Sequence, residues 1–262
     1  MTAASLGDGQ PAPRTVAAFD FDGTITRGGS VFPFLISARG LLPVLAAVVR
    51  TSPSLVRGAV AGGSAADRGK ERLFVRLLSG VPAAHLDRQG RAFAEHHLRR
   101  HLRPEMRDRM AWHRRQGHLV VIVSASPECY VRPAGELLGV DGVLATRLAV
   151  EGSGRVTGRY DGKNCRGAEK YARVVGWLRA EGLAGAGAPQ PVLWAYGNSR
   201  GDLRLLEGAD HPVNAGLLGR FGRLGRFPSL AAVVADAPST ASPTTGPPER
   251  HPPAPRPSRS AP

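Results

Sequence analysis

The most constraining feature of the sequence is an apolar run that ends in two closely spaced aspartates. Residues 15–19 read Thr-Val-Ala-Ala-Phe, which is typical of a buried strand, and Asp20 and Asp22 follow directly. Because open α/β sheets bind ligands beyond the carboxyl ends of their strands, both carboxylates are expected at such an edge. Gly23 allows the chain to turn sharply beside them. An Asp-Gly turn after a core strand would give the same local pattern, so the remaining sequence has to separate the two interpretations.

Two carboxylates one residue apart can bind one hard cation and act on one reacting centre. One of them can attack a phosphorus atom while the other moves protons. Thr24 adds a hydroxyl and a backbone N–H that can bind an anion. Asp20 and Asp22 therefore predict phosphoryl transfer through an aspartyl-phosphate.

Segments of strand and helix character alternate along the chain. Strands are expected at 15–20, 118–124, 142–150, 191–196 and 211–214, with a hairpin formed by 148–150 and 155–160. Helices are expected at 105–116, 127–138, 167–180 and 200–208. This alternation predicts an α/β fold with a doubly wound parallel sheet and helices on both faces.

Residues 30–104 contain no clear strand and are helical by pattern, which is too much helix for one crossover. We therefore expect a core of residues 15–29 and 105–236 and an inserted helical module over the strand ends. Residues 1–14 and 237–262 are rich in Pro, Gly, Ser and Thr and are predicted to be disordered tails.

The most apolar stretch, residues 31–49, is interrupted by Arg39, Gly40 and two prolines. Each piece is too short to span a bilayer, so we expect two helices of a soluble domain. Interfacial contact with lipid stays open as an alternative. The first fourteen residues lack the apolar core of a signal peptide, and the two cysteines have no ligand-like spacing. A reduced, cytoplasmic setting is expected, although one disulfide is an alternative.

Two further clusters look suited to phosphate. Ser124 and Ala125 end the strand at 118–124 and precede Pro127, a residue favoured in the first helical turn. A hydroxyl just before a helix N-terminus makes an anion site, so Ser124 is expected to hold a phosphate oxygen, unless the segment is a plain turn. Lys170 lies in the first turn of helix 167–180 and could neutralise a phosphoryl group or be solvated.

The last cluster, Gly197-Asn198-Ser199-Arg200-Gly201-Asp202, ends another apolar strand. Asp202 could complete an oxygen-only site for Mg²⁺ with Asp20 and Asp22. Ser199 and Asp202 also match a capping box, and both interpretations can hold at once.

These four clusters, in this order and context, resemble the motifs of the haloacid dehalogenase-like superfamily. The helical insert resembles the type-I cap of its subfamily IB, the phosphoserine-phosphatase-like branch, and the resemblance spans about residues 15–220. It implies a Rossmann-like core and a phosphomonoester hydrolase.

The resemblance also implies roles for individual residues. Asp20 would be the nucleophile and a Mg²⁺ ligand, and Asp22 the general acid and base, binding the metal through its carbonyl. The phosphoryl group would be bound by Thr24, Ser124, Ala125 and Lys170. Asn198 and Asp202 would complete the metal site.

The sequence departs from the family pattern in two places. Many relatives have Asp where this chain has Asn198, so the metal site loses a charge and direct ligation could pass to Asp202. Phosphoserine phosphatases carry a Glu shortly after the first motif, whereas residues 25–31 contain no acid. Phosphoserine is therefore disfavoured, and the apolar, basic insert suits a lipid-linked or other small phosphomonoester.

Charge leaves two alternatives open. The net charge of +14 favours anionic partners, which include phosphate esters, nucleic acid and, in transient contact, anionic membranes. A basic stretch could bind nucleic acid or be a solvated helix face; it contains Trp112 and the arginines Arg99, Arg100, Arg103, Arg107, Arg109, Arg114 and Arg115. Aromatic residues are only 6%, so no specific nucleic acid is expected. A phosphotransferase using the same Asp20 intermediate is the other alternative.

Overall fold

The computed structural model describes residues 14–61, 63–185, 189–216 and 224–235. The predicted tails, 1–14 and 237–262, lie outside this part of the chain apart from Arg14. The described residues contain a five-stranded parallel sheet in the order β3-β2-β1-β6-β7. Its strands are β1 (Thr15–Phe19), β2 (Leu119–Pro127), β3 (Gly142–Thr146), β6 (Val192–Gly197) and β7 (His211–Asn214).

Strand β1 is the centre of the sheet and is buried on both faces. Ala17 and Phe19 point into one apolar cluster, whereas Val16 and Ala18 point into the other. Because side chains alternate across a strand, this run of apolar residues suits a sheet covered on both sides.

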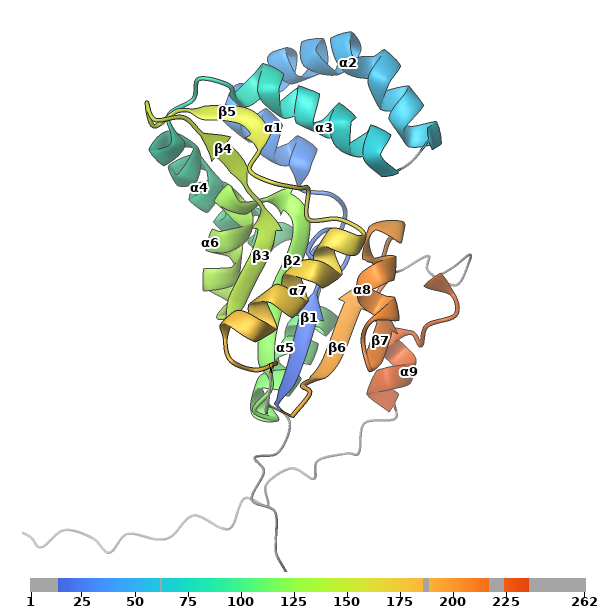
Figure 1. Cartoon of the computed structure of the whole chain (residues 1–262). Helices are drawn as coiled ribbons and strands as arrows, with labels where there is room; N and C mark the ends of the chain where they lie inside the picture. The colour runs from blue at the N-terminus through green and yellow to red at the C-terminus, as the bar shows by residue number, and fades with distance from the viewer. Residues whose placement is uncertain (1–13, 62, 186–188, 217–223, 236–262) are drawn as a thin grey trace, which may run out of the picture.

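Helices cover both faces, as predicted for a doubly wound fold (Figure 1). One cluster includes residues of α5 (Pro104–Arg115) and α6 (Glu128–Leu138). The other includes residues of α7 (Ala168–Ala180) and α8 (Leu203–Glu207). The 3-10 helix η1 (Arg200–Asp202) precedes α8, and α9 (Leu230–Ala235) follows β7.

The predicted strand 142–150 is wrong in one respect, because it forms two strands. β3 stays in the main sheet, whereas β4 (Leu148–Val150) leaves it and pairs with β5 (Val156–Tyr160) in the predicted hairpin. The expected start of a helix at 127 is also one residue early. Pro127 still pairs with Thr146 of β3, and its backbone (φ −57, ψ 132) is not helical.

Residues 30–104 form the helices α1 (Val31–Arg39), α2 (Leu41–Ala61), α3 (Gly63–Leu78) and α4 (Ala83–His101). Helices α2 and α3 lie side by side at one end of the molecule, above the carboxyl edge of the sheet (Figure 1). Helix α4 instead packs on α6, so closely that a Cβ on Gly90 would lie 2.0 Å from the carbonyl oxygen of Cys129.

The β4–β5 hairpin connects the two parts of the chain. Val156 accepts a hydrogen bond from the backbone N–H of Gly80 (2.8 Å) and donates one to the carbonyl of Val81 (2.9 Å). The backbone of Gly158, with φ +76, approaches α3 so closely that a Cβ would lie 2.6 Å from the carbonyl oxygen of Phe74. The predicted division at residues 29 and 104 stays a prediction, and the hairpin contacts α3 although it belongs to the predicted core.

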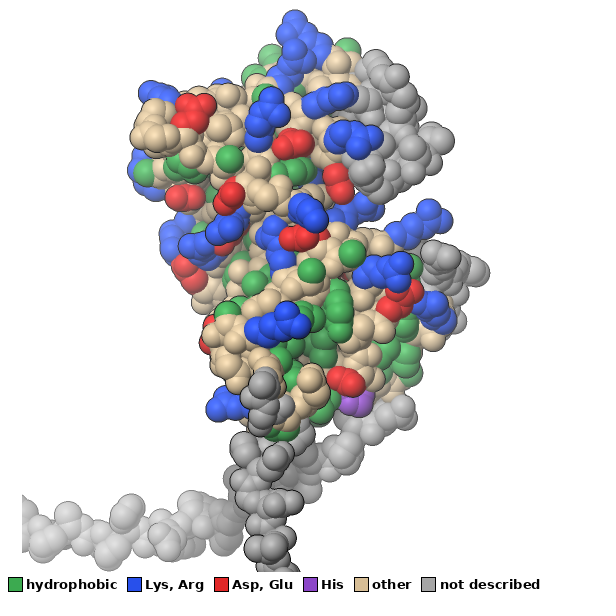
Figure 2. All heavy atoms as spheres, in the orientation of Figure 1, with side chains coloured by type: hydrophobic (Ala, Val, Ile, Leu, Met, Phe, Trp, Pro, Cys, Tyr) green, Lys and Arg blue, Asp and Glu red, His purple; other side chains and the backbone are tan. Residues whose placement is uncertain are grey.

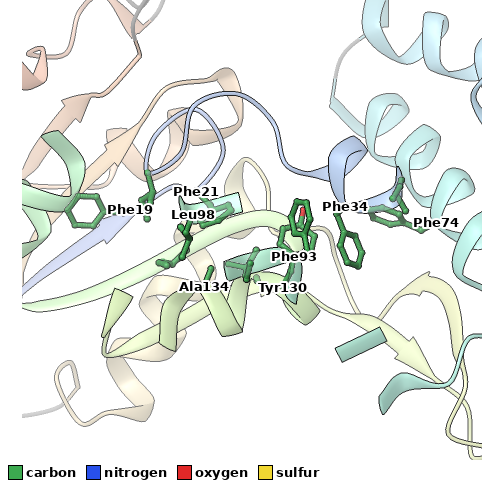
Figure 3. Close-up of a cluster of buried hydrophobic side chains, with 14 of the residues drawn as sticks. Phe19, Phe21, Phe34, Phe74, Phe93, Leu98, Tyr130 and Ala134 are labelled. Atoms are coloured by element: carbon green, nitrogen blue, oxygen red, sulfur yellow. The ribbon is translucent and has the colours of Figure 1, made fainter. Parts of the chain in front are cut away.

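An aromatic cluster joins α1 to the core. Phe34 packs against Phe93 of α4 and Tyr130 of α6, with ring centroids 5.4 and 4.7 Å away, and these two rings also contact each other (Figure 3). Cys129 and Cys165 are both free thiols, so the alternative of a disulfide is not realised. Within the described residues, no helix combines the length and the apolar character that crossing a membrane requires.

Candidate active site

The predicted site residues meet at the carboxyl edge of the sheet. Asp20 and Asp22 follow β1, Ser124 lies near the end of β2, and Asn198 follows β6. These three strands are adjacent in the sheet, so their ends bring residues more than 170 positions apart in the sequence together. Lys170 reaches the same place from the first turn of α7.

Lys170 links two of the carboxylates. Its Nζ lies 2.5 Å from Oδ1 of Asp20 and 2.5 Å from Oδ1 of Asp202, and its side chain is only 2% exposed. Burial alone would lower the pKa of Lys170, but the charges of the two carboxylates outweigh burial and raise it. The lysine is therefore charged at neutral pH, and the alternative of a solvated helix lysine is wrong.

Asp20 is held in place by three neighbours. Besides Lys170, Thr24 donates a hydrogen bond from Oγ1 to Oδ2 of Asp20 (3.2 Å), and the backbone N–H of Asp20 donates to the carbonyl of Tyr196 (2.9 Å). Burial is the main reason that the pKa of Asp20 is raised from 3.8 to about 7, with the charge of Asp202 adding to it and Lys170 opposing it. A poorly solvated carboxylate facing a cation is well suited to act as a nucleophile.

Asp22 points toward the other side of the site, where α1 and α6 begin. Its Oδ1 accepts a hydrogen bond from the backbone N–H of Ser30 (2.7 Å), and its Oδ2 accepts one from the hydroxyl of Ser126. Ser30 in turn bonds to the phenol of Tyr130 (2.9 Å between oxygens). Burial raises the pKa of Tyr130, so this phenol stays protonated.

The last residues of β2, 124–127, lead directly into α6 and carry polar groups; we call them the β2–α6 connection. Oγ of Ser124 accepts a hydrogen bond from the backbone N–H of Ser126 (3.1 Å), which leaves its own proton for another acceptor. The carbonyl of Ala125 accepts from Thr146 (2.9 Å). These bonds fix the backbone just before α6, as an anion site at a helix start requires.

Asp202 makes the predicted capping contact with one carboxylate oxygen and binds Lys170 with the other. Its Oδ2 accepts hydrogen bonds from the backbone N–H groups of Ser199 (2.9 Å) and Asn198 (3.1 Å). Ser199 Oγ in turn accepts one from the backbone N–H of Gly201, and these contacts form the predicted capping box. Oδ1 of Asp202 remains for Lys170. The capping contact therefore orients the second oxygen into the site.

Asn198 is the residue best placed to accept a metal. Its Oδ1 is buried and has no hydrogen-bond partner in the structure. Such an oxygen is costly to bury unless something binds it, and amide oxygens are ordinary ligands of hard cations. No group of three His, Cys, Asp or Glu residues suited to a metal occurs in the described part of the chain. A Mg²⁺ site here would therefore need this amide oxygen and backbone oxygens in addition to carboxylates. Gly23 faces Asn198 with φ +77, and a Cβ there would lie 2.0 Å from its Nδ2.

Sequence reasoning missed Lys70 of α3. Its Nζ donates to the carbonyl of Ala125 (2.8 Å) and to Oδ1 of Asn164 (3.2 Å), so a helix of the insert is tied to the β2–α6 connection. Burial lowers the pKa of Lys70 to about 8, against the opposing charges of Asp67 and Asp22. A signal was available in the composition, because the chain has only three lysines against 32 arginines.

The basic stretch is not a solvated face throughout. Arg103 is 3% exposed and donates from Nη1 to the carbonyls of Gly23 (2.9 Å) and Ala215 (2.6 Å), so it ties the turn that follows Asp22 to the segment that follows β7. Arg109 is 4% exposed, donates to the hydroxyl of Tyr196 (2.6 Å) and stacks over Trp112. These two arginines and the tryptophan are therefore structural.

Comparison with known proteins assigns the family. The model of haloacid dehalogenase-like hydrolases matches residues 17–207, so the chain belongs to that family. The predicted family, the α/β fold and the enzyme class, a phosphatase, are confirmed. Phosphomonoester hydrolysis follows from this class at a general level.

Several relatives and solved structures are similar to the chain. Protein CicA of Caulobacter vibrioides is 34% identical over 199 residues, covering 74% of this chain and 83% of its own length. A probable phosphatase of Mycobacterium tuberculosis is 31% identical over 229 residues, covering 78% and 70%. A crystal structure from Bordetella pertussis Tohama I, of unknown function, has a TM-score of 0.64 at 25% identity and covers 77% of this chain and 90% of that one.

A phosphoserine phosphatase, solved as an analogue of its phospho-aspartyl intermediate, has a TM-score of 0.54 at 18% identity. It covers 77% of this chain and 86% of that one. At this identity the likeness establishes the fold alone.

Proposed function

We propose that the chain hydrolyses phosphomonoesters in two steps through an aspartyl-phosphate on Asp20. An oxygen of Asp20 attacks phosphorus, the ester P–O bond breaks, and Asp22 gives its proton to the leaving alkoxide. Asp22 then takes a proton from water, whose oxygen attacks the same phosphorus. The Asp20–phosphorus bond breaks, so that free phosphate and the Asp20 carboxylate are regenerated.

The observation that carries this proposal is the buried Lys170, bonded at 2.5 Å to both Asp20 and Asp202. A phosphoryl group that approaches Asp20 adds negative charge to a site that already holds two carboxylates against one lysine. Lys170 offsets part of this charge, and the Ser124 hydroxyl and the N–H groups of the β2–α6 connection, Ala125 included, can donate to the phosphoryl oxygens. Thr24 contributes by orienting Asp20.

Mg²⁺ fits the same set of residues. Asp20, the carbonyl of Asp22 and the unpaired Oδ1 of Asn198 would hold it, with Asp202 acting directly or through water. When bound, the ion would neutralise charge on the phosphoryl oxygens. Within the chain itself, Arg103 binds the carbonyl of Gly23 and so helps to fix the turn that carries Asp20 and Asp22.

Asp22 is suited to the proton transfers because of what surrounds it. Its two oxygens are oriented by Ser30 and Ser126 on the side of the insert, which is where a leaving group would lie if phosphorus sits on Asp20. Lys70, bonded to Ala125, links α3 to this side of the site and provides a cation for a charged or hydroxylated leaving group.

For the substrate, we propose a lipid-linked or other small phosphomonoester rather than phosphoserine. Residues 25–31 offer no carboxylate for a substrate ammonium, and the insert that follows is apolar and basic. A panel of phosphomonoesters tests this directly. Equal turnover of phosphoserine and lipid phosphates would contradict the substrate class.

The same assay tests the reaction. Phosphate release should require Mg²⁺ and should be lost in Asp20→Asn, with Asp108→Asn as the matched control because Asp108 lies in an exposed ion pair with Arg107. Persistent activity of Asp20→Asn, after deamidation has been excluded, would refute the nucleophile. Product that appears on an added alcohol instead of as free phosphate would favour a phosphotransferase.

A further inference from the structure

The outer surface of α1 and α2 carries a concentration of exposed apolar side chains. Six large hydrophobic residues within residues 32–49 are exposed, which is more than all the rest of the described chain contributes. Their exposed fractions are Phe32 47%, Ile36 37%, Leu41 52%, Leu42 77%, Leu45 49% and Val49 70%. We call these six residues the cap apolar surface. Scattered single apolar residues need no explanation, but a cluster on two contacting helices does.

The helical geometry of α2 explains why these residues are not simply core. Val44, Ala47 and Thr51 are buried, and their spacing of three and four residues defines the face that packs inward. Leu41 and Leu45, one turn apart, lie on a different face and remain half exposed. A surface helix normally has polar residues there. Helix α2 therefore has one apolar face that packs on the protein and a second apolar face that is exposed and available to a binding partner.

The charge around this surface indicates what that partner is. Residues 23–66 contain no Asp or Glu, while Arg39 and Arg50 are exposed beside the apolar residues. In Figure 2, Lys and Arg side chains stand out on the end of the molecule that Figure 1 assigns to α2 and α3. Apolar side chains flanked by arginines and free of carboxylates match an anionic lipid surface, where the apolar part enters the headgroup boundary.

Two other occupants fit less well. A symmetric dimer would set this surface against its own copy, so Arg39 and Arg50 would face like charges without a carboxylate nearby. Residues 236–262 contain no Leu, Ile, Val, Met or aromatic side chain that could cover the apolar residues. We propose that the cap apolar surface docks on an anionic membrane surface without crossing it.

Docking at this place would bring the active site close to the membrane. Helix α1 begins directly after Ser30, whose N–H binds the carboxylate of Asp22. Its inner face holds Phe34 against Tyr130, whereas Phe32 and Ile36 face outward. The helix that contributes to the membrane surface therefore also helps to orient the proposed acid and base.

Sedimentation with lipid vesicles tests the proposal. Wild-type protein should bind vesicles of phosphatidylcholine and phosphatidylglycerol and bind much less to pure phosphatidylcholine, and added salt should weaken the binding. The double variant Leu42→Ser/Leu45→Ser should lose about tenfold in affinity because it removes two inserting side chains. Arg39→Gln/Arg50→Gln should lose about thirtyfold in affinity at low salt, because it removes two basic side chains near the anionic surface.

The matched control is Leu137→Ser/Val150→Ser, which removes two apolar residues of 50% and 52% exposure elsewhere on the molecule. It should bind as the wild type does, and thermal melting should verify that all variants fold. Asp20→Asn should also bind normally, so a failure of the proposed catalysis and a failure of docking are distinguishable. Equal binding by the Leu42/Leu45 variant and the control, or no preference for anionic vesicles, would overturn the proposal. If the wild type is a dimer that does not bind vesicles, and Leu42→Ser/Leu45→Ser makes it monomeric, the surface instead belongs to an interface with a second copy of the chain.

Discussion

Replacing the proposed nucleophile should make the metal-free protein more stable. In the folded chain the pKa of Asp20 is raised from 3.8 to about 7, chiefly by burial and then by the charge of Asp202. The folded state therefore keeps a proton on Asp20 at pH values where the unfolded chain has lost it. Stability conferred by that proton is lost as the pH rises from 3.8 towards 7. Asp20→Asn, which stays neutral, escapes this loss.

The size of the effect follows from the shift. Each pKa unit corresponds to about 1.4 kcal/mol, so a shift from 3.8 to about 7 makes the ionised Asp20 cost about 4 kcal/mol of folding free energy above neutral pH. Asp20→Asn should gain a stabilisation of this order there and almost none near pH 3.8. Replacing a buried catalytic carboxylate is expected to raise the stability of the protein and to abolish its activity, because the active site holds the like charges of Asp20 and Asp202 together.

Urea unfolding of both proteins in a metal chelator, over a series of pH values, measures the difference. Asp108→Asn, an exposed carboxylate variant, should show no comparable gain. Adding Mg²⁺ should stabilise the wild type more than Asp20→Asn and so narrow the gap, because a ligand stabilises only the state that binds it. A less stable Asp20→Asn above neutral pH, or a difference that does not change with pH, would refute the reasoning.

Three further variants test other parts of the site. Lys70→Met should lower kcat/KM by about tenfold, since it removes one charged hydrogen bond between α3 and the β2–α6 connection, whereas the exposed Lys163→Met should not. Asn198→Asp should tighten Mg²⁺ binding, measured by calorimetry, by about tenfold because it adds a charge at the unpaired oxygen; unchanged binding would exclude Asn198 as a ligand. Burial lowers the pKa of His113 from 6.5 to about 2, so its contribution to the free energy of unfolding should fall by about 1.4 kcal/mol for each pH unit below 6.5. His113→Gln should reduce this dependence on pH, measured by urea unfolding. An unchanged dependence would show that His113 is not the buried neutral group responsible.

The parts of the site that the sequence predicts are those built from local segments. Asp20, Ser124 and Asn198 each follow or end an apolar strand, and a parallel sheet brings such ends together without any further information. The capping box at Ser199 and Asp202 is equally local, because both partners lie within four residues. The doubly wound fold follows from the same alternation of strands and helices.

The parts that escaped prediction depend on contacts distant in the sequence. Lys70 meets Ala125 across 55 positions, and Arg103 reaches the carbonyl of Ala215 across 112. Both cations bind backbone oxygens, which any residue provides, so the acceptor leaves no trace in the sequence. The break between β3 and β4 has a similar cause, because Leu148 pairs with Tyr160 of the hairpin instead of continuing in the main sheet.

Trapping the intermediate on Asp20 tests the central claim most directly. In Asp22→Asn, p-nitrophenyl phosphate can still transfer its phosphoryl group because its leaving group needs no proton, but water is no longer activated, so the aspartyl-phosphate should accumulate. Hydroxylamine converts such an acyl phosphate into a stable hydroxamate. Trypsin, cutting after Arg14 and Arg27, then releases residues 15–27, in which Asp20 is the only remaining aspartate of this variant. We predict the hydroxamate in that peptide and its absence when Asp20 is also Asn; turnover without label at residue 20, or label on another peptide, would contradict the account.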